Sequence, residues 1–181
     1  MKRILLLSVG MLLLIGCSGD DSNTADQTSE NAAVETTAKA EVVQVAAVHD
    51  LTLPSLDGST INLGDYAGEV ILVDFWATWC DPCRRVMPSL QEMHDEMADK
   101  GVRIVALSTD RKGASVVGPF IAEHGYTFPV ALMNQQAFNV FGEVSSIPTT
   151  FIIKGDGSIA EKMVGAHPKK DYLAAIERAR I

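Results

Sequence analysis

The strongest constraint on the fold of this chain is a pair of cysteines that closely follows a buried strand. Residues Glu69 to Trp76 form a nearly continuous apolar run, which is typical of a central strand covered on both faces. Cys80 and Cys83 follow, one helical turn apart. If Cys80 opens the next helix, the helix dipole and free backbone N–H groups favour a thiolate there. The spacing therefore predicts a dithiol redox centre, with Cys80 as the nucleophile and Cys83 as the resolving cysteine.

Alternating strands and helices on either side of the cysteines predict an α/β domain. The helix after the cysteines carries apolar residues at three- and four-residue spacing. A later helix between Ser115 and His124 is expected to be broken by Gly118-Pro119. The other predicted elements are a hairpin of strands 51–53 and 60–62, strands 102–107 and 128–132, a helix 135–141, a second hairpin of strands 149–153 and 158–164, and a closing helix 168–178.

An acidic residue, Asp74, lies inside the first buried run, where a carboxylate is costly unless it is protonated, hydrogen-bonded or used in chemistry. Burial raises the pKa of a carboxyl group, so we expect Asp74 to exchange a proton with Cys83. The alternative is a structural aspartate paired with another buried polar group.

Other roles for the cysteine pair are open to test. A permanent disulfide would close a very small loop and stabilise the fold little. Half of a zinc site would need two further ligands, and no second cysteine pair is present. Two thiolates could also hold Cu(I) in a metallochaperone, a binding function without catalysis. We expect no metal site and no cofactor beyond the cysteines themselves.

The first sixteen residues have the features of a bacterial export signal. Lys2 and Arg3 precede an apolar run of about a dozen residues, which is too short to span a bilayer comfortably. The run ends at Leu14-Ile15-Gly16-Cys17, which resembles the lipobox at which such signals are cut and the new N-terminal cysteine is acylated. We predict a signal peptide over 1–16, lipid attachment at Cys17, and an extracytoplasmic protein anchored to a bacterial membrane.

Residues 17–48 are rich in Ser, Thr, Ala, Asp and Glu and predict a flexible tether, so the globular domain is expected over 49–181. Assigning Cys17 to a lipid leaves Cys80 and Cys83 as a self-contained pair among the three cysteines. The chain has 15 basic and 23 acidic side chains, and it lacks the basic stripe that phosphate recognition requires. We therefore expect no nucleic-acid partner.

Several motifs together resemble the TlpA/ResA-like thiol-disulfide oxidoreductases, the membrane-anchored bacterial branch of the thioredoxin-fold superfamily. The resemblance covers about 49–181 and implies a thioredoxin-like fold: a central mixed sheet flanked by helices, with an N-terminal β-hairpin and a central insertion. It rests on Asp74, Trp79-Cys80-Asp81-Pro82-Cys83, Pro88 and Ser146-Ile147-Pro148-Thr149.

The resemblance also implies how the site works. Pro148 would follow a cis peptide bond beside the dithiol, Ile147 would offer backbone groups to an extended substrate, and Trp79 would form an apolar contact surface. Relatives often carry an acid three residues after the second cysteine, where this chain has Val86. Proton handling by Asp74 is thus expected to be more like that of thioredoxin.

By the same resemblance, the substrates would be disulfides in exported proteins, and a membrane thiol-electron transporter would supply electrons. Cytochrome c maturation is one plausible client pathway. The residues themselves leave the direction of exchange open, because Asp81 opposes a thiolate at Cys80 while the helix dipole favours it.

A peroxiredoxin-like peroxidase is the nearest rival within the enzymes. A peroxidatic cysteine in that family follows Thr or Ser by three residues and Pro by seven. Ala77 and Val73 occupy those positions here, which favours thiol-disulfide exchange.

Overall fold

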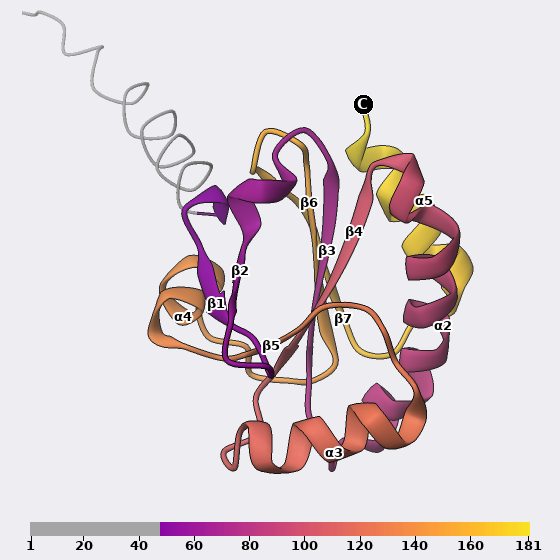
Figure 1. Ribbon diagram of the computed structural model, residues 1–181. Helices are drawn as coiled ribbons and strands as arrows, with labels where there is room; N and C mark the ends of the chain where they lie inside the picture. Colours follow the sequence, from indigo (N-terminus) through magenta and orange to yellow (C-terminus); the bar gives the residue numbers. More distant parts are fainter. Residues whose placement is uncertain (1–47) are drawn as a thin grey trace, which may run out of the picture. The chain divides into compact units, whose positions relative to one another are not determined.

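The computed structural model describes residues 48–181 (Figure 1). The predicted signal peptide, Cys17 and nearly all of the predicted tether lie outside these residues. Along the described chain the elements are β1 (Thr52–Pro54), β2 (Thr60–Asn62), the 3-10 helix η1 (Leu63–Tyr66), β3 (Val70–Trp76), α2 (Asp81–Met97), the 3-10 helix η2 (Ala98–Lys100), β4 (Val102–Ser108), α3 (Ala114–His124), β5 (Val130–Leu132), α4 (Gln135–Phe141), β6 (Thr149–Ile153), β7 (Ile159–Val164) and α5 (Lys169–Ala179).

A five-stranded mixed sheet forms the centre of the domain, in the order β5-β4-β3-β6-β7. Strand β3 pairs in parallel with β4 and antiparallel with β6, and β6 pairs antiparallel with β7. The predicted N-terminal hairpin is confirmed as a separate two-stranded antiparallel sheet of β1 and β2. The α/β class and the mixed sheet of the thioredoxin-like fold are thus confirmed.

Helices cover the sheet on both faces, which explains why every residue of β3 is buried. Side chains alternate across a strand. Leu72 and Trp76 belong to the core layer that contains residues of α2 and α5, whereas Val73 and Phe75 belong to the layer that contains residues of the hairpin and α4. Figure 1 shows α2 and α5 side by side on one side of the sheet, with β1, β2 and α4 on the other.

Helix α2 carries the cysteine pair, and its limits follow from local chemistry. Cys80 is the N-cap residue and Pro82 lies in the first turn, where its missing N–H costs nothing. The predicted apolar stripe of α2 is buried. After η2, Gly101 takes a left-handed conformation with φ of 72°, which ends the helical segment.

Helix α3 corrects one expectation, because it runs unbroken through Gly118 and Pro119. Proline removes one helical hydrogen bond, but the fully buried Val117 packs into the same core layer as α2 and keeps the helix in place. Gly125, with φ of 69°, ends α3 as predicted.

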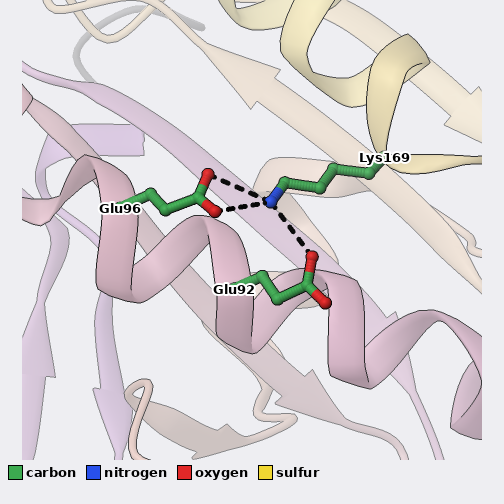
Figure 2. Close-up of polar contacts among 3 residues, drawn as sticks. All are labelled: Glu92, Glu96 and Lys169. Atoms are coloured by element: carbon green, nitrogen blue, oxygen red, sulfur yellow. Dashed lines mark hydrogen bonds and ion pairs between the residues drawn. The ribbon is translucent and has the colours of Figure 1, made fainter.

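An ion cluster joins the start of α5 to the outer surface of α2 (Figure 2). The Nζ atom of Lys169 lies 3.0 Å from a carboxylate oxygen of Glu92 and 2.9 and 3.0 Å from the two oxygens of Glu96. One cation therefore links two helices that pack on the same face of the sheet.

None of the helices within 48–181 combines the length and apolar character needed to cross a bilayer.

Candidate active site

Cys80 and Cys83 form a disulfide at the start of α2, with an S–S distance of 2.05 Å and a Cα–Cα distance of 5.3 Å. Cys80 is 4% exposed, while Cys83 is fully buried. An incoming sulfur therefore reaches Cys80 before Cys83, and Cys83 lies where it can attack the Sγ of Cys80 from the protein side.

The surroundings of Cys80 suit a thiolate in the reduced state. Its Sγ accepts a hydrogen bond from the backbone N–H of Cys83 at 3.3 Å, one of the otherwise unpaired donors at the start of α2. The positive end of the helix dipole points to the same atom. Both effects favour the charged form of Cys80 over the thiol.

A loop before β6 lies against the cysteine pair. The Ile147–Pro148 peptide bond is cis, as the resemblance implied. The carbonyl oxygen of Ile147 is 3.7 Å from the Sγ of Cys80. The hydroxyl of Thr149 donates to the carbonyl of Ser146 at 2.7 Å and ties the loop together. Ile147 is therefore close enough to Cys80 to contact a polypeptide whose sulfur is bound there.

The two tryptophans next to the cysteines differ in environment. Trp79 is 70% exposed, one of the few large apolar side chains on the described surface. Trp76 is fully buried, and its ring packs against Phe120 with a centroid distance of 5.4 Å. The first forms an apolar surface beside Cys80, and the second is part of the core.

Asp74 is completely buried on the face of β3 that α2 covers. Its Oδ1 accepts a hydrogen bond from the Thr150 hydroxyl at 2.6 Å, while its Oδ2 has no partner among residues 48–181. Burial raises the pKa of Asp74 to about 7, against the opposing effect of the Thr150 hydrogen bond. Cys83 belongs to the core layer on this same face of the sheet.

Three polar residues of the site were not anticipated from the sequence. Thr150 meets Asp74 only because the β3–β6 register places the two residues opposite each other. Tyr172 of α5 is buried on the same side, and its pKa is raised by burial and by the charge of Asp74. Asp110 accepts hydrogen bonds from the backbone N–H and the hydroxyl of Thr78, both at 2.8 Å, and so fixes the segment that leads into the cysteines. The only available signal was the position of Asp110 just beyond a predicted buried strand.

Within 48–181, no group of three or more His, Cys, Asp and Glu side chains could hold a metal ion. The described residues bring the Ile147–Pro148 loop against Cys80 and Cys83, with Trp79 exposed beside them. Asp74 lies on the sheet face whose core layer contains Cys83. Cys17, the predicted lipid site, lies outside the described residues.

Thiol-disulfide exchange is the chemistry that this arrangement supports, and the sheet order and helix layers place it on a thioredoxin-like fold. Residues 45–162 match the model of the AhpC/TSA family. The chain is 34% identical over 130 residues to the thiol-disulfide oxidoreductase ResA of Bacillus thuringiensis, covering 71% of this chain and 74% of that protein. The chain therefore belongs to the AhpC/TSA family, among the ResA-type thiol-disulfide oxidoreductases.

Two further comparisons agree. A ResA protein of Oceanobacillus iheyensis is 41% identical over 111 residues, a match that covers 61% of this chain and 57% of that relative's length. The crystal structure of a putative thiol:disulfide interchange protein DsbE from Chlorobium tepidum superposes with a TM-score of 0.63 at 32% identity, covering 73% of this chain and 94% of that one. The chain is thus an oxidoreductase whose substrates contain disulfides.

Proposed function

We propose that the protein reduces disulfides in exported proteins through the Cys80/Cys83 dithiol. The observation that carries the proposal is the unequal placement of the two cysteines. The Sγ of Cys80 keeps a small exposure and accepts a hydrogen bond from the backbone N–H of Cys83. Cys83 is buried on the face where one carboxylate oxygen of Asp74 has no partner among residues 48–181. Thiol-disulfide exchange at a dithiol uses these two environments for its two steps, and the reduction potential of the pair decides the direction.

In the first step, the Cys80 thiolate attacks one sulfur of the client disulfide. A bond forms between Cys80 and that sulfur, the client S–S bond breaks, and the second client sulfur leaves as a thiolate that takes a proton from water. The client is then held through a mixed disulfide, with Ile147 beside the attached sulfur.

In the second step, Cys83 loses its proton to Asp74, directly or through one water molecule, and attacks the Sγ of Cys80. The Cys80–Cys83 disulfide forms and the first client sulfur leaves. The client has gained two electrons and the protein dithiol has lost them. Because the cysteines carry the electrons, the proposed reaction needs no separate cofactor.

The proposal includes a location and an electron supply. The basic start, the apolar run and Cys17 support export followed by lipid attachment at a bacterial membrane. Disulfides persist outside the cytoplasm, so a reductase there must be recharged, and a membrane thiol-electron transporter is the donor that we propose. Apocytochrome c maturation is one client pathway. Metabolic labelling with a fatty acid, absent in Cys17→Ala, tests the anchor.

The reduction potential of the Cys80/Cys83 pair tests the direction. A value near that of thioredoxin, about −270 mV, is expected for a reductase, whereas a value near about −120 mV would identify a protein that installs disulfides. Tight stoichiometric binding of Cu(I) with negligible disulfide exchange would instead favour the metallochaperone.

The role of Asp74 as a proton acceptor is tested by measuring only the second step, in which Cys83 resolves the mixed disulfide. In Asp74→Ala, a preformed mixed disulfide between Cys80 and a client peptide should resolve more slowly near neutral pH. The wild-type rate should rise with pH through the titration of Asp74. Unchanged resolution across pH in the variant would remove this role.

A further inference from the structure

A groove of about 540 Å³ opens beside the cysteine pair, next to the exposed Trp79. Its lining includes Trp79, Thr78 and Val116 together with the charged residues Asp110, Arg111 and Lys112. Because Trp79 immediately precedes Cys80, a polypeptide bound through its sulfur to Cys80 can reach this groove within a few extended residues. We call it the Trp79 groove.

The charges in the Trp79 groove are not equivalent. Asp110 is engaged by the protein itself, since its carboxylate accepts hydrogen bonds from Thr78 and from the hydroxyl of Ser108. Arg111 and Lys112 are exposed, and neither forms an ion pair with any residue of 48–181. Among the described residues, the groove thus offers two cations without an ion-pair partner beside an apolar indole.

This local charge is opposite to that of the whole chain, whose formal net charge is −8. An acidic protein repels acidic partners at long range, so a cationic groove beside its reactive sulfur favours selected acidic segments there. A strongly anionic membrane surface is disfavoured by the same net charge. The indole of Trp79 adds an apolar surface of the kind that anchors bound polypeptides.

We propose that the Trp79 groove binds an acidic segment of the client polypeptide, within a few residues of the client cysteine that bonds to Cys80. The proposal deepens the proposed function and rests on it, since the segment is part of the disulfide substrate. It names a preference among clients and leaves the exchange chemistry at Cys80 and Cys83 as described.

The test uses Cys83→Ser, in which the mixed disulfide with Cys80 accumulates whichever direction the protein serves. Two peptide disulfides are compared that differ only in Asp and Glu against Asn and Gln near the cysteine. The acidic peptide should react about tenfold faster at low salt, as expected for two exposed charge pairs acting together, and the preference should shrink with added salt.

Reversing the two charges of the Trp79 groove then tests whether the preference for the acidic peptide depends on this groove. Arg111→Glu with Lys112→Glu should bring the rate ratio of the two peptides to about one or below. The matched control, Lys100→Glu with Lys170→Glu, changes the net charge equally at two exposed positions outside the groove. It should leave most of the preference in place.

The possible outcomes distinguish failure of the docking proposal from failure of the proposed function. Equal rates for both peptides in the Cys83→Ser protein would overturn the docking proposal while leaving exchange at Cys80 intact. Failure of both peptides to form a mixed disulfide would overturn the proposed function itself. An equal loss of preference in the control would assign the effect to overall charge. Displacement of the acidic peptide by anionic phospholipid vesicles, dependent on Arg111 and Lys112, would assign the groove to a membrane.

Discussion

Replacing Asp74 by Asn should change how the stability of the protein depends on pH. Asp74 is fully buried, and only one of its two carboxylate oxygens is hydrogen-bonded within the described chain. The folded protein therefore favours the protonated carboxyl group, while the unfolded chain ionises it at its ordinary pKa. Asn keeps the shape and stays neutral at every pH, so the difference between the two proteins isolates this one titration.

The magnitude follows from the shift in pKa. Burial raises the pKa of Asp74 from 3.8 to about 7, and each pKa unit corresponds to about 1.4 kcal/mol. Between these two values the unfolded chain binds fewer protons than the folded protein, so stability falls as pH rises. Relative to Asp74→Asn, the wild-type free energy of unfolding should fall by about 4 kcal/mol between pH 4 and pH 8.

Denaturant unfolding of both oxidised proteins at a series of pH values measures this difference. Other titrating groups affect both proteins equally and cancel. The unpartnered amide N–H of Asn adds a cost of about 1–3 kcal/mol that does not vary with pH. A difference that stays flat from pH 4 to pH 8 would refute the reasoning, because Asp74 would then titrate at its ordinary pKa in the folded protein.

Two further predictions concern the groups around Asp74 and the helices that enclose it. Thr150→Val removes the donor to the carboxylate, so the pKa of Asp74 should rise further above about 7. In this variant the fall in stability between pH 4 and pH 8 should exceed that of the wild type by up to about 1.4 kcal/mol, measured by the same unfolding series. Little change at pH 4 is the internal control. Lys169→Met breaks the ion cluster between α5 and α2 and should lower the unfolding temperature slightly at low salt. The loss should disappear at high salt, because salt screens exposed charges. A loss that persists at high salt would mean that packing, not charge, links the helices there.

Local patterns in the sequence predicted most of the secondary structure and the position of the cysteines. The apolar run that became β3 and the three- and four-residue spacing in α2 each depend on neighbouring residues, so they can be read without knowing the fold. The break expected in α3 was wrong because packing of Val117 outweighs the local effect of Pro119. Tertiary packing therefore determined the conformation of α3, whose local sequence signals were weak.

The polar partners of the site could not be predicted, since they depend on pairing between distant segments. Thr150 faces Asp74 through a strand register joining residues that are 76 positions apart. Thr78 meets Asp110 across 32 positions. Nothing in the local sequence around either residue indicates these contacts.

The central claim, that Cys80 attacks and Cys83 resolves, is tested most directly by trapping the mixed disulfide with single cysteine variants. Reduced wild type, Cys83→Ser and Cys80→Ser are each mixed with the same peptide disulfide and analysed by intact-protein mass spectrometry. The account predicts turnover in the wild type, a single stable peptide adduct in Cys83→Ser and no adduct in Cys80→Ser. An adduct that forms as readily in Cys80→Ser would contradict it, because the buried Cys83 would then be the attacking residue.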